Sequence, residues 1–152
     1  GPLLGKLKQR HPEIIFTGPK VGTELSQHYA SADIFLFASE SETFGNVVLE
    51  AMSSGLAVVA YDYAAARMHI NNQLNGLVVQ PGKPAEFRNA AVKLVKQPET
   101  INAIRNQARL TAEKLDWTHI IDHFEKVLVR YVKSKSCAKR KSEQAVSADG
   151  PA

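Results

Sequence analysis

Residues 33–61 read DIFLFASESETFGNVVLEAMSSGLAVVAY, an apolar run, an amphipathic segment and a second apolar run. Both apolar runs have the length and continuous hydrophobicity of strands buried on both faces. Between them, the apolar residues recur at the i, i+3, i+4, i+7, i+8 spacing of a helix, and Gly55 supplies a C-terminal stop. These spaced residues are Phe44, Val47, Val48, Ala51 and Met52. The stretch therefore predicts a strand, a loop, a helix and a second strand.

The flanking sequence repeats this alternation. Apolar or β-branched runs bounded by Pro and Gly predict further strands at residues 13–17 and 76–80. Helical patterns precede, separate and follow the strands, with Thr23 and Asp62 as expected N-caps of two of them. The expected helices span residues 3–11, 23–31, 62–71, 84–96, 98–114 and 117–132. Alternating helices and continuously apolar strands predict an α/β fold, a Rossmann-like parallel sheet with helices on both faces.

Length and composition fit one domain without a membrane-spanning segment. The chain has 152 residues, 44% of them hydrophobic, and a single cysteine, Cys137. No run of about 18 apolar residues and no basic-headed signal peptide is present, so a reducing cytoplasm is the expected location. Residues 133–152 hold five Lys or Arg and two Asp or Glu, a net charge of +3 out of +4. We therefore expect a folded domain at 1–132 and a basic, disordered tail at 133–152, with no nucleic-acid binding by the nearly neutral domain.

Two acidic residues flank the start of the central helix. Glu42 and Glu50 are eight positions apart, and a fully helical path would separate their Cα atoms by about 12 Å. Acid–base pairs in glycosidases need carboxyl groups about 5–9.5 Å apart. The longer spacing favours contacts of the two glutamates with different parts of one long ligand. The N–H groups of Gly45, Asn46 and Val47 at the helix start suit a phosphate or diphosphate. A nucleotide sugar has this layout, with hydroxyls on both sides of its phosphates.

These residues resemble a known family. The pattern Glu42-x7-Glu50 is similar to the E-x7-E signature of the C-terminal domain of GT-B glycosyltransferases of family GT4. The resemblance extends to Phe16-Thr17-Gly18, to Tyr29–Asp33 and to Asn75–Val79, and it covers roughly residues 1–132. It implies the C-terminal half of a GT-B fold whose first strands, and whose whole N-terminal domain, are missing here.

The resemblance also implies roles. Glu50 would bind the nucleotide ribose and Glu42, also the catalytic candidate, the donor sugar. Backbone amides of Phe44, Gly45, Asn46 and Val47 would bind sugar and diphosphate, with Gly18, Lys20, Val21 and Arg67 near the base or phosphates. The implied reaction is retaining transfer of a hexose from a nucleotide diphosphate sugar to a glycan or lipid-linked acceptor, in cell-envelope polysaccharide synthesis. It needs no metal or other cofactor.

Departures from the family pattern carry expectations of their own. Many relatives have a Gly-Gly-x-Pro-Glu loop where this chain has Tyr63-Ala64-Ala65-Ala66-Arg67, which leaves the donor open. The strands expected to be missing carry the Arg and Lys that neutralise the diphosphate. We therefore expect this chain alone to bind donors weakly and to turn over little or nothing.

Several alternatives stay open. The chain is either the donor-binding portion of such an enzyme or a non-catalytic nucleotide-sugar binding module. The final helix from Trp117 either docks on this domain or presents an interface, and the basic tail is the candidate for a peripheral membrane contact. His119 and His123 have metal-ligand spacing but no third partner, so no metal site is expected. A dehydrogenase is disfavoured because no G-x-G-x-x-G follows a strand.

Overall fold

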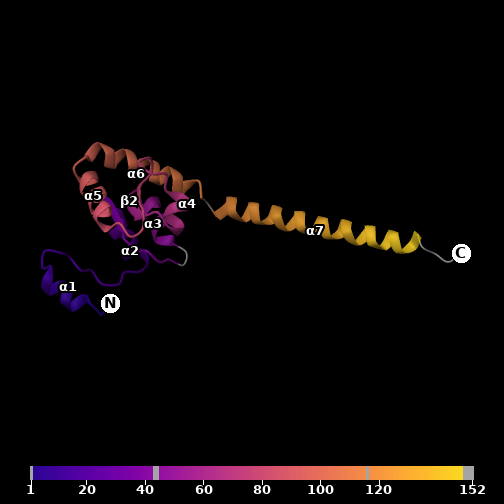
Figure 1. The fold of residues 1–152 in the computed structure, drawn as a ribbon, viewed down its shortest axis with the longest axis horizontal. Coiled ribbons are helices and arrows are strands. Elements are labelled where there is room, and N and C mark those ends of the chain that lie inside the picture. The colour runs from indigo at the N-terminus through magenta and orange to yellow at the C-terminus, as the bar shows by residue number, and fades with distance from the viewer. Residues whose placement is uncertain (1, 43–44, 116, 149–152) are drawn as a thin grey trace. The chain divides into compact units, whose positions relative to one another are not determined.

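The computed structural model describes residues 2–42, 45–115 and 117–148 of the chain (Figure 1). It forms two compact units, residues 1–111 and residues 112–152. The first unit contains the sheet and the residues of the candidate site. The second consists mainly of one long helix.

The first unit is built on a parallel three-stranded sheet in the order β1-β2-β3. Its strands are β1 (Ile34–Phe37), β2 (Ala57–Tyr61) and β3 (Leu77–Val79), with Ile34 opposite Ala57 and Val59 opposite Leu77. All five residues of β2 are buried. A central strand covered on both faces has no polar side to show, which explains why its sequence is apolar without alternation.

Helices cover both faces of this sheet (Figure 1). Ala57, Val59 and Tyr61 point to one face and pack with Phe87, Leu94 and Ile104 from the two helices that follow β3. The alternate residues of β2 face the helices on either side of it in the sequence. The expected fold class is therefore confirmed. The helices are α1 (Leu4–Arg10), α2 (Gly22–Ala30), α3 (Asn46–Ser53), α4 (Ala64–His69), α5 (Pro84–Val95), α6 (Pro98–Glu113) and α7 (Trp117–Ala148).

The strand expected at residues 13–17 is absent. The N–H of Ile14 donates instead to the carbonyl of His11 at 3.1 Å, which closes a turn. The side chains of Ile14 and Ile15 are 50% and 88% exposed. β-branched residues favour a strand only where a neighbouring strand pairs with them. In the described part of the chain, residues 13–17 pair with no strand.

Both expected N-caps are wrong. The N-cap of α2 is Val21, and Thr23 lies inside the helix. The N-cap of α4 is Tyr63, because the N–H of Asp62 still donates to the carbonyl of Val79 at 2.7 Å and keeps that residue in the sheet. The carboxylate of Asp62 accepts hydrogen bonds from Arg67 and Gln80 instead.

Two polar side chains fix α6 to the rest of the first unit. Asn75 is buried, accepts from the N–H of Asn71 at 2.7 Å, and donates to the carbonyl of His69 and to Thr111 Oγ1, each at 3.0 Å. Arg105 donates to the carbonyl of Gly55 at 2.7 Å and to Asp33 at 2.6 Å. Because these groups are hydrogen-bonded, the cost of removing them from water is offset, and they hold α6 against the rest of the unit.

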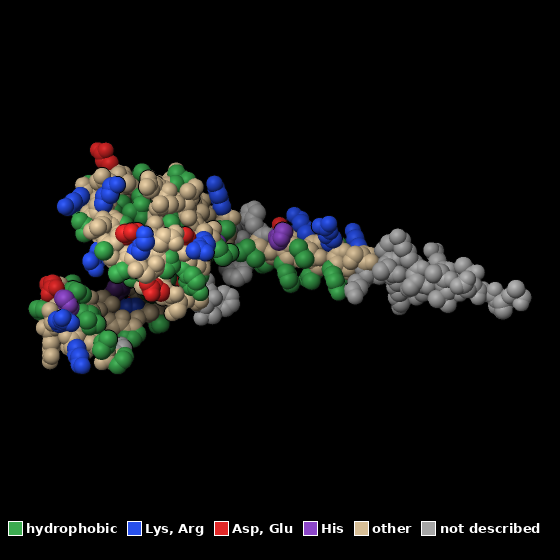
Figure 2. All heavy atoms as spheres, viewed as in Figure 1, with side chains coloured by type: hydrophobic (Ala, Val, Ile, Leu, Met, Phe, Trp, Pro, Cys, Tyr) green, Lys and Arg blue, Asp and Glu red, His purple; other side chains and the backbone are tan. Residues whose placement is uncertain are grey.

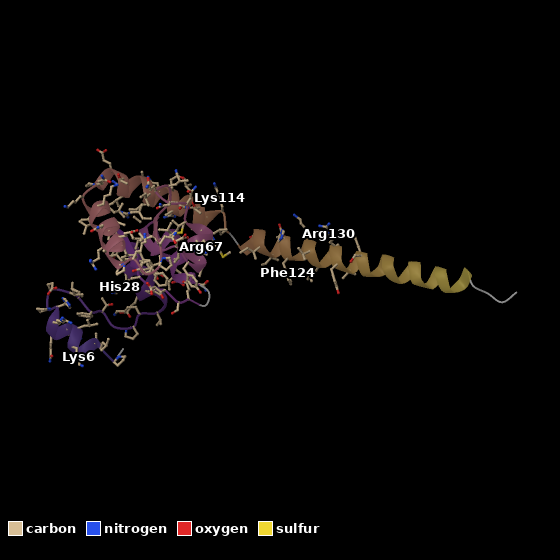
Figure 3. The ribbon with its side chains drawn as sticks, in the orientation of Figure 1. Lys6, His28, Arg67, Lys114, Phe124 and Arg130 are labelled. Carbon is tan, nitrogen blue, oxygen red and sulfur yellow. The ribbon has the colours of Figure 1, made fainter. Side chains whose placement is uncertain are left out.

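The helix of the second unit is longer than the expected span of residues 117–132. α7 continues to Ala148, so residues 133–148, expected to be disordered, are helical. No Gly or Pro interrupts residues 117–148, and their many Lys, Arg, Glu and Ala residues are good helix formers. Along the described part of α7, hydrophobic side chains gather on one side and Lys and Arg on the other (Figure 2). Phe124 and Arg130 point to opposite sides (Figure 3). Within the described residues, no helix has the length and apolarity needed to cross a membrane.

Candidate functional site

The loops that follow the three strands are tied together at the carboxyl edge of the sheet. Glu40, after β1, accepts a hydrogen bond through Oε1 from the N–H of Gly82, after β3, at 2.9 Å. Asp62, after β2, accepts one through Oδ2 from Gln80 Nε2 at 3.1 Å. Ligands of open parallel sheets bind at this edge. The loop that carries Glu42 is therefore anchored where such a ligand is expected.

Gly45 is the turning point between this loop and α3. It is buried and is the N-cap of α3, with φ 69° and ψ 23° in the left-handed region. A Cβ atom at this position would collide with the Ala65 side chain and with the Glu42 carboxyl group. Only glycine meets both the conformation and the close approach. Its place at the helix start leaves Asn46 and Val47 in the first turn, whose N–H groups have no acceptor within the helix.

Glu42 lies back over Gly45 rather than extending away from it. Its side chain is half-buried, and its Oε1 atom is buried without a hydrogen-bond partner in the described part of the chain. α3 begins only at Asn46, so the spacing of about 12 Å expected for a helical path between Glu42 and Glu50 does not apply. A buried acceptor without a donor is the arrangement expected of a group that hydrogen-bonds a ligand.

Glu50 is exposed on α3 and is held by a residue from another helix. Tyr29 of α2 donates its hydroxyl to Glu50 Oε2 at 3.3 Å. Partial burial raises the pKa of Tyr29, and the negative charge and hydrogen bond of Glu50 raise it further. The sequence places Tyr29 in the motif Tyr29–Asp33 but indicates no role for its side chain. Its place in that motif is the sequence feature that could have marked Tyr29 as functional. Nothing in the sequence indicates that its hydroxyl faces Glu50.

The other candidate residues are less closely involved. Phe44 lies outside the described residues, while Val47 is half-buried and Asn46 exposed on α3. Lys20 pairs with Glu24 at 3.2 Å, beside the exposed Gly18 and Val21 in the segment leading to α2. Arg67 pairs with Asp62 at 3.2 Å. Within the described part of the chain, neither Lys20 nor Arg67 forms a hydrogen bond or an ion pair with Glu42 or Glu50.

The start of α4 is strained. Ala64 has φ 43°, a conformation that side chains with a Cβ rarely adopt, and its neighbour Ala65 is the residue that approaches Gly45. The Gly-Gly-x-Pro-Glu loop of the pattern that this chain resembles has its two glycines where this chain has Tyr63 and Ala64. The strained residue therefore stands where that pattern has glycine.

Replacing Ala64 with glycine should raise the free energy of unfolding by about 0.5–1 kcal/mol, because relief of the positive φ outweighs the added chain entropy. The matched control is Ala66→Gly, in the same helix, which should lower it by about 1 kcal/mol through loss of a buried methyl group and of helix propensity. Urea denaturation of both variants measures the difference. Equal destabilisation by the two substitutions would contradict the assignment of strain to Ala64.

A family model described as glycosyl transferases group 1 matches residues 1–97. The chain belongs to this family. Among curated relatives of this group 1 chain, sulfoquinovosyl transferase SQD2 of Arabidopsis thaliana is 43% identical over 106 residues, which cover 68% of this chain and 21% of that protein.

Solved structures of glycosyltransferases share the fold of this group 1 chain. Sucrose-phosphate synthase of Thermosynechococcus elongatus has a TM-score of 0.76 at 21% identity, over 88% of this chain and 34% of that one. The pneumococcal O-GlcNAc transferase GtfA, in complex with UDP and GlcNAc, has a TM-score of 0.69 at 25% identity, over 86% and 27%. The chain thus spans between about a fifth and a third of the length of these proteins.

Proposed function

We propose that this chain is the donor-binding portion of a GT4-type retaining glycosyltransferase, which transfers a hexose from a nucleotide diphosphate sugar to a glycan or lipid-linked acceptor. The observation that carries the proposal is the arrangement around Gly45. A helix start with available N–H groups lies beside the buried, unpartnered Oε1 of Glu42, and Glu50 follows on the same helix. Membership of the family and the UDP-bound relative support the donor class.

Each part of this site has a chemical task in the proposed reaction. The helix start binds the diphosphate through its N–H groups and the favourable end of the helix dipole. Glu42 accepts from hydroxyls of the donor sugar, which relieves its lack of a partner, and Glu50 accepts from the ribose diol. Charge on the diphosphate leaving group is stabilised by main-chain donors, and the proposal includes no metal ion. The acceptor, an N-terminal GT-B partner domain and a cytoplasmic site of action, at the inner face of a membrane, belong to the same proposal.

The residues described near the site are short of free cations. Lys20 and Arg67 each form an ion pair within the chain, with Glu24 and Asp62 respectively. A diphosphate bound here gains little from either side chain. We therefore expect the 152-residue chain alone to bind donors weakly, at about millimolar concentration, and to transfer sugar barely or not at all.

The test is a calorimetric or NMR titration of the 152-residue chain with UDP-, GDP- and ADP-sugars up to millimolar concentration. At least one should bind, and Glu50→Ala should weaken that binding about tenfold, since it removes the charged acceptor for the ribose. Glu99→Ala removes an exposed carboxylate in the first turn of α6 and should leave binding unchanged. Lack of binding by every nucleotide sugar, or equal effects of the two substitutions, would overturn the proposed function.

The second candidate function is a non-catalytic nucleotide-sugar binding module. The pairing of Lys20 and Arg67 with acids is the observation that favours it, because catalysis of phosphate departure benefits from free cations. The two candidates differ in transfer, not in binding. Sugar transfer by a protein that contains this chain together with a preceding GT-B domain would decide for the enzyme.

A further inference from the structure

We infer that Tyr29 is a positioning residue that orients the Glu50 carboxylate toward the ribose of the donor. The inference rests on the proposed function and assigns a role in that site to a residue outside the two-glutamate signature. Its basis is the hydrogen bond from the Tyr29 hydroxyl to Glu50 Oε2, which joins α2 to α3 across 21 residues of sequence.

Glu50 needs an external partner to hold its orientation. It is exposed on α3, and a free glutamate side chain on a helix surface samples many rotamers that binding must then restrict. The bond from Tyr29 occupies Oε2, which leaves Oε1 with its lone pairs for a ligand hydroxyl. The 3.3 Å separation is long for such a bond, as is common in free sites whose hydrogen bonds tighten on ligand binding.

Tyr29 is itself fixed by the first strand. Its ring meets Phe35 of β1 edge to face, with ring centroids 5.8 Å apart and an interplanar angle of 61°. Phe35 in turn stacks on Phe37, two residues along the same strand, at 5.9 Å. The N–H of Ala32 donates to the carbonyl of Tyr29 at 3.1 Å in the short connection from α2 to β1. A rigid path therefore runs from the sheet through aromatic rings to the phenol hydroxyl.

The pair also has a signature in the absence of any ligand. Partial burial first, and then the charge and hydrogen bond of Glu50, raise the pKa of Tyr29 above its ordinary value of 10.0. Within the described residues, Glu50 is the charged group that raises the pKa of Tyr29. The folded state favours the neutral phenol of Tyr29 over its ionised form. The stability that this preference contributes is therefore fully present below pH 10.0, and it is lost as the pH rises through the pKa of Tyr29 in the folded state.

The decisive experiment compares a ribonucleotide with its 2′,3′-dideoxy analogue as ligands of the 152-residue chain. The nucleoside diphosphate used is the one whose sugar binds in the titration described above. Tyr29→Phe keeps the ring that packs on Phe35 and removes only the hydroxyl, so the urea unfolding midpoint should barely move. The substitution should weaken ribonucleotide binding about fivefold and change dideoxynucleotide binding less than about twofold.

Three further variants separate positioning from general effects. In a Glu50→Ala background, Tyr29→Phe should have little additional effect on either ligand, because the hydroxyl then has no side-chain acceptor at position 50. Tyr131→Phe removes a phenol hydroxyl from α7 and should leave both affinities unchanged. Glu50→Gln should also lower the pKa of Tyr29 toward 10.0 in an absorbance titration without ligand.

The outcomes distinguish this inference from the proposed function. If the wild-type chain binds nucleotides but Tyr29→Phe weakens both ligands equally, or neither, the positioning role is wrong while the donor site stands. A Tyr29 pKa that does not respond to Glu50→Gln also overturns the inference. Failure of every nucleotide to bind the wild-type chain overturns the proposed function and the inference with it.

Discussion

Gly45→Ala is expected to lower the free energy of unfolding by about 2–5 kcal/mol and to eliminate detectable nucleotide-sugar binding. An alanine at φ 69° is strained by itself, and its Cβ would collide with the Ala65 side chain and the Glu42 carboxyl group. Relief of either collision moves a part of the site, because Ala65 lies in the α4 start and Glu42 is the proposed sugar-binding residue. Urea denaturation measures the first effect and calorimetry the second.

Gly55→Ala is the matched control. Gly55 has φ 74°, close to that of Gly45, but a Cβ there would meet nothing within 4 Å. The substitution should therefore cost only the conformational term, about 1–2 kcal/mol, and should leave nucleotide-sugar affinity unchanged. If both variants lose the same stability, the close packing around Gly45 contributes nothing, and its assignment as the centre of the site is contradicted.

Local pattern was sufficient to predict the central unit of this fold. Residues 33–61 show strand, helix and strand because burial of β2 on both faces requires an apolar sequence, and because α3 buries only one stripe. Val48, Ala51 and Met52, three members of the expected stripe, are the buried residues of α3. Such periodicities report which side of an element meets the core, whatever the rest of the chain does.

The misplaced elements were those that depend on distant neighbours. Residues 13–17 have the composition of a strand, but strand pairing is a property of two segments, and the local turn from His11 to Ile14 prevailed. Asp62 has the side chain of an N-cap, yet its backbone is still bonded to β3. Neither competition can be judged from one segment alone, because the competing partner is supplied by the tertiary fold.

The sequence indicates which residues form the candidate site but not how they are arranged. Gly45 followed by a helical stripe indicated a helix start, and two glutamates indicated grips on a hydroxylated ligand. The Glu42 carboxyl group lies close to Gly45 because of the conformation of the intervening loop. A loop has no repeating sequence pattern from which this conformation could be predicted. The bond between Tyr29 and Glu50 joins two helices whose relative placement no spacing rule gives. Side-chain partners of this kind emerge only once the fold is assembled.

Glu42→Ala is expected to raise the free energy of unfolding by about 1 kcal/mol while it weakens nucleotide-sugar binding at least about tenfold. Oε1 of Glu42 is buried without a partner in the described part of the chain, so the free protein bears a desolvation cost that a bound sugar hydroxyl would relieve. Removal of the carboxyl group ends that cost together with the contact. Stability and affinity should therefore change in opposite directions, as measured by urea denaturation and calorimetry.

Glu40→Ala provides the control in the same loop. Glu40 has its hydrogen bond, from the N–H of Gly82, so its removal should lower the free energy of unfolding by about 1 kcal/mol. The two substitutions delete the same group two residues apart and differ in whether the fold satisfies it. A loss of stability in Glu42→Ala equal to that in Glu40→Ala would show that Glu42 holds the loop in place. Changes of opposite sign in the free energy of unfolding would show that the Glu42 carboxylate destabilises the free protein. That is expected of a residue whose role is to bind a ligand.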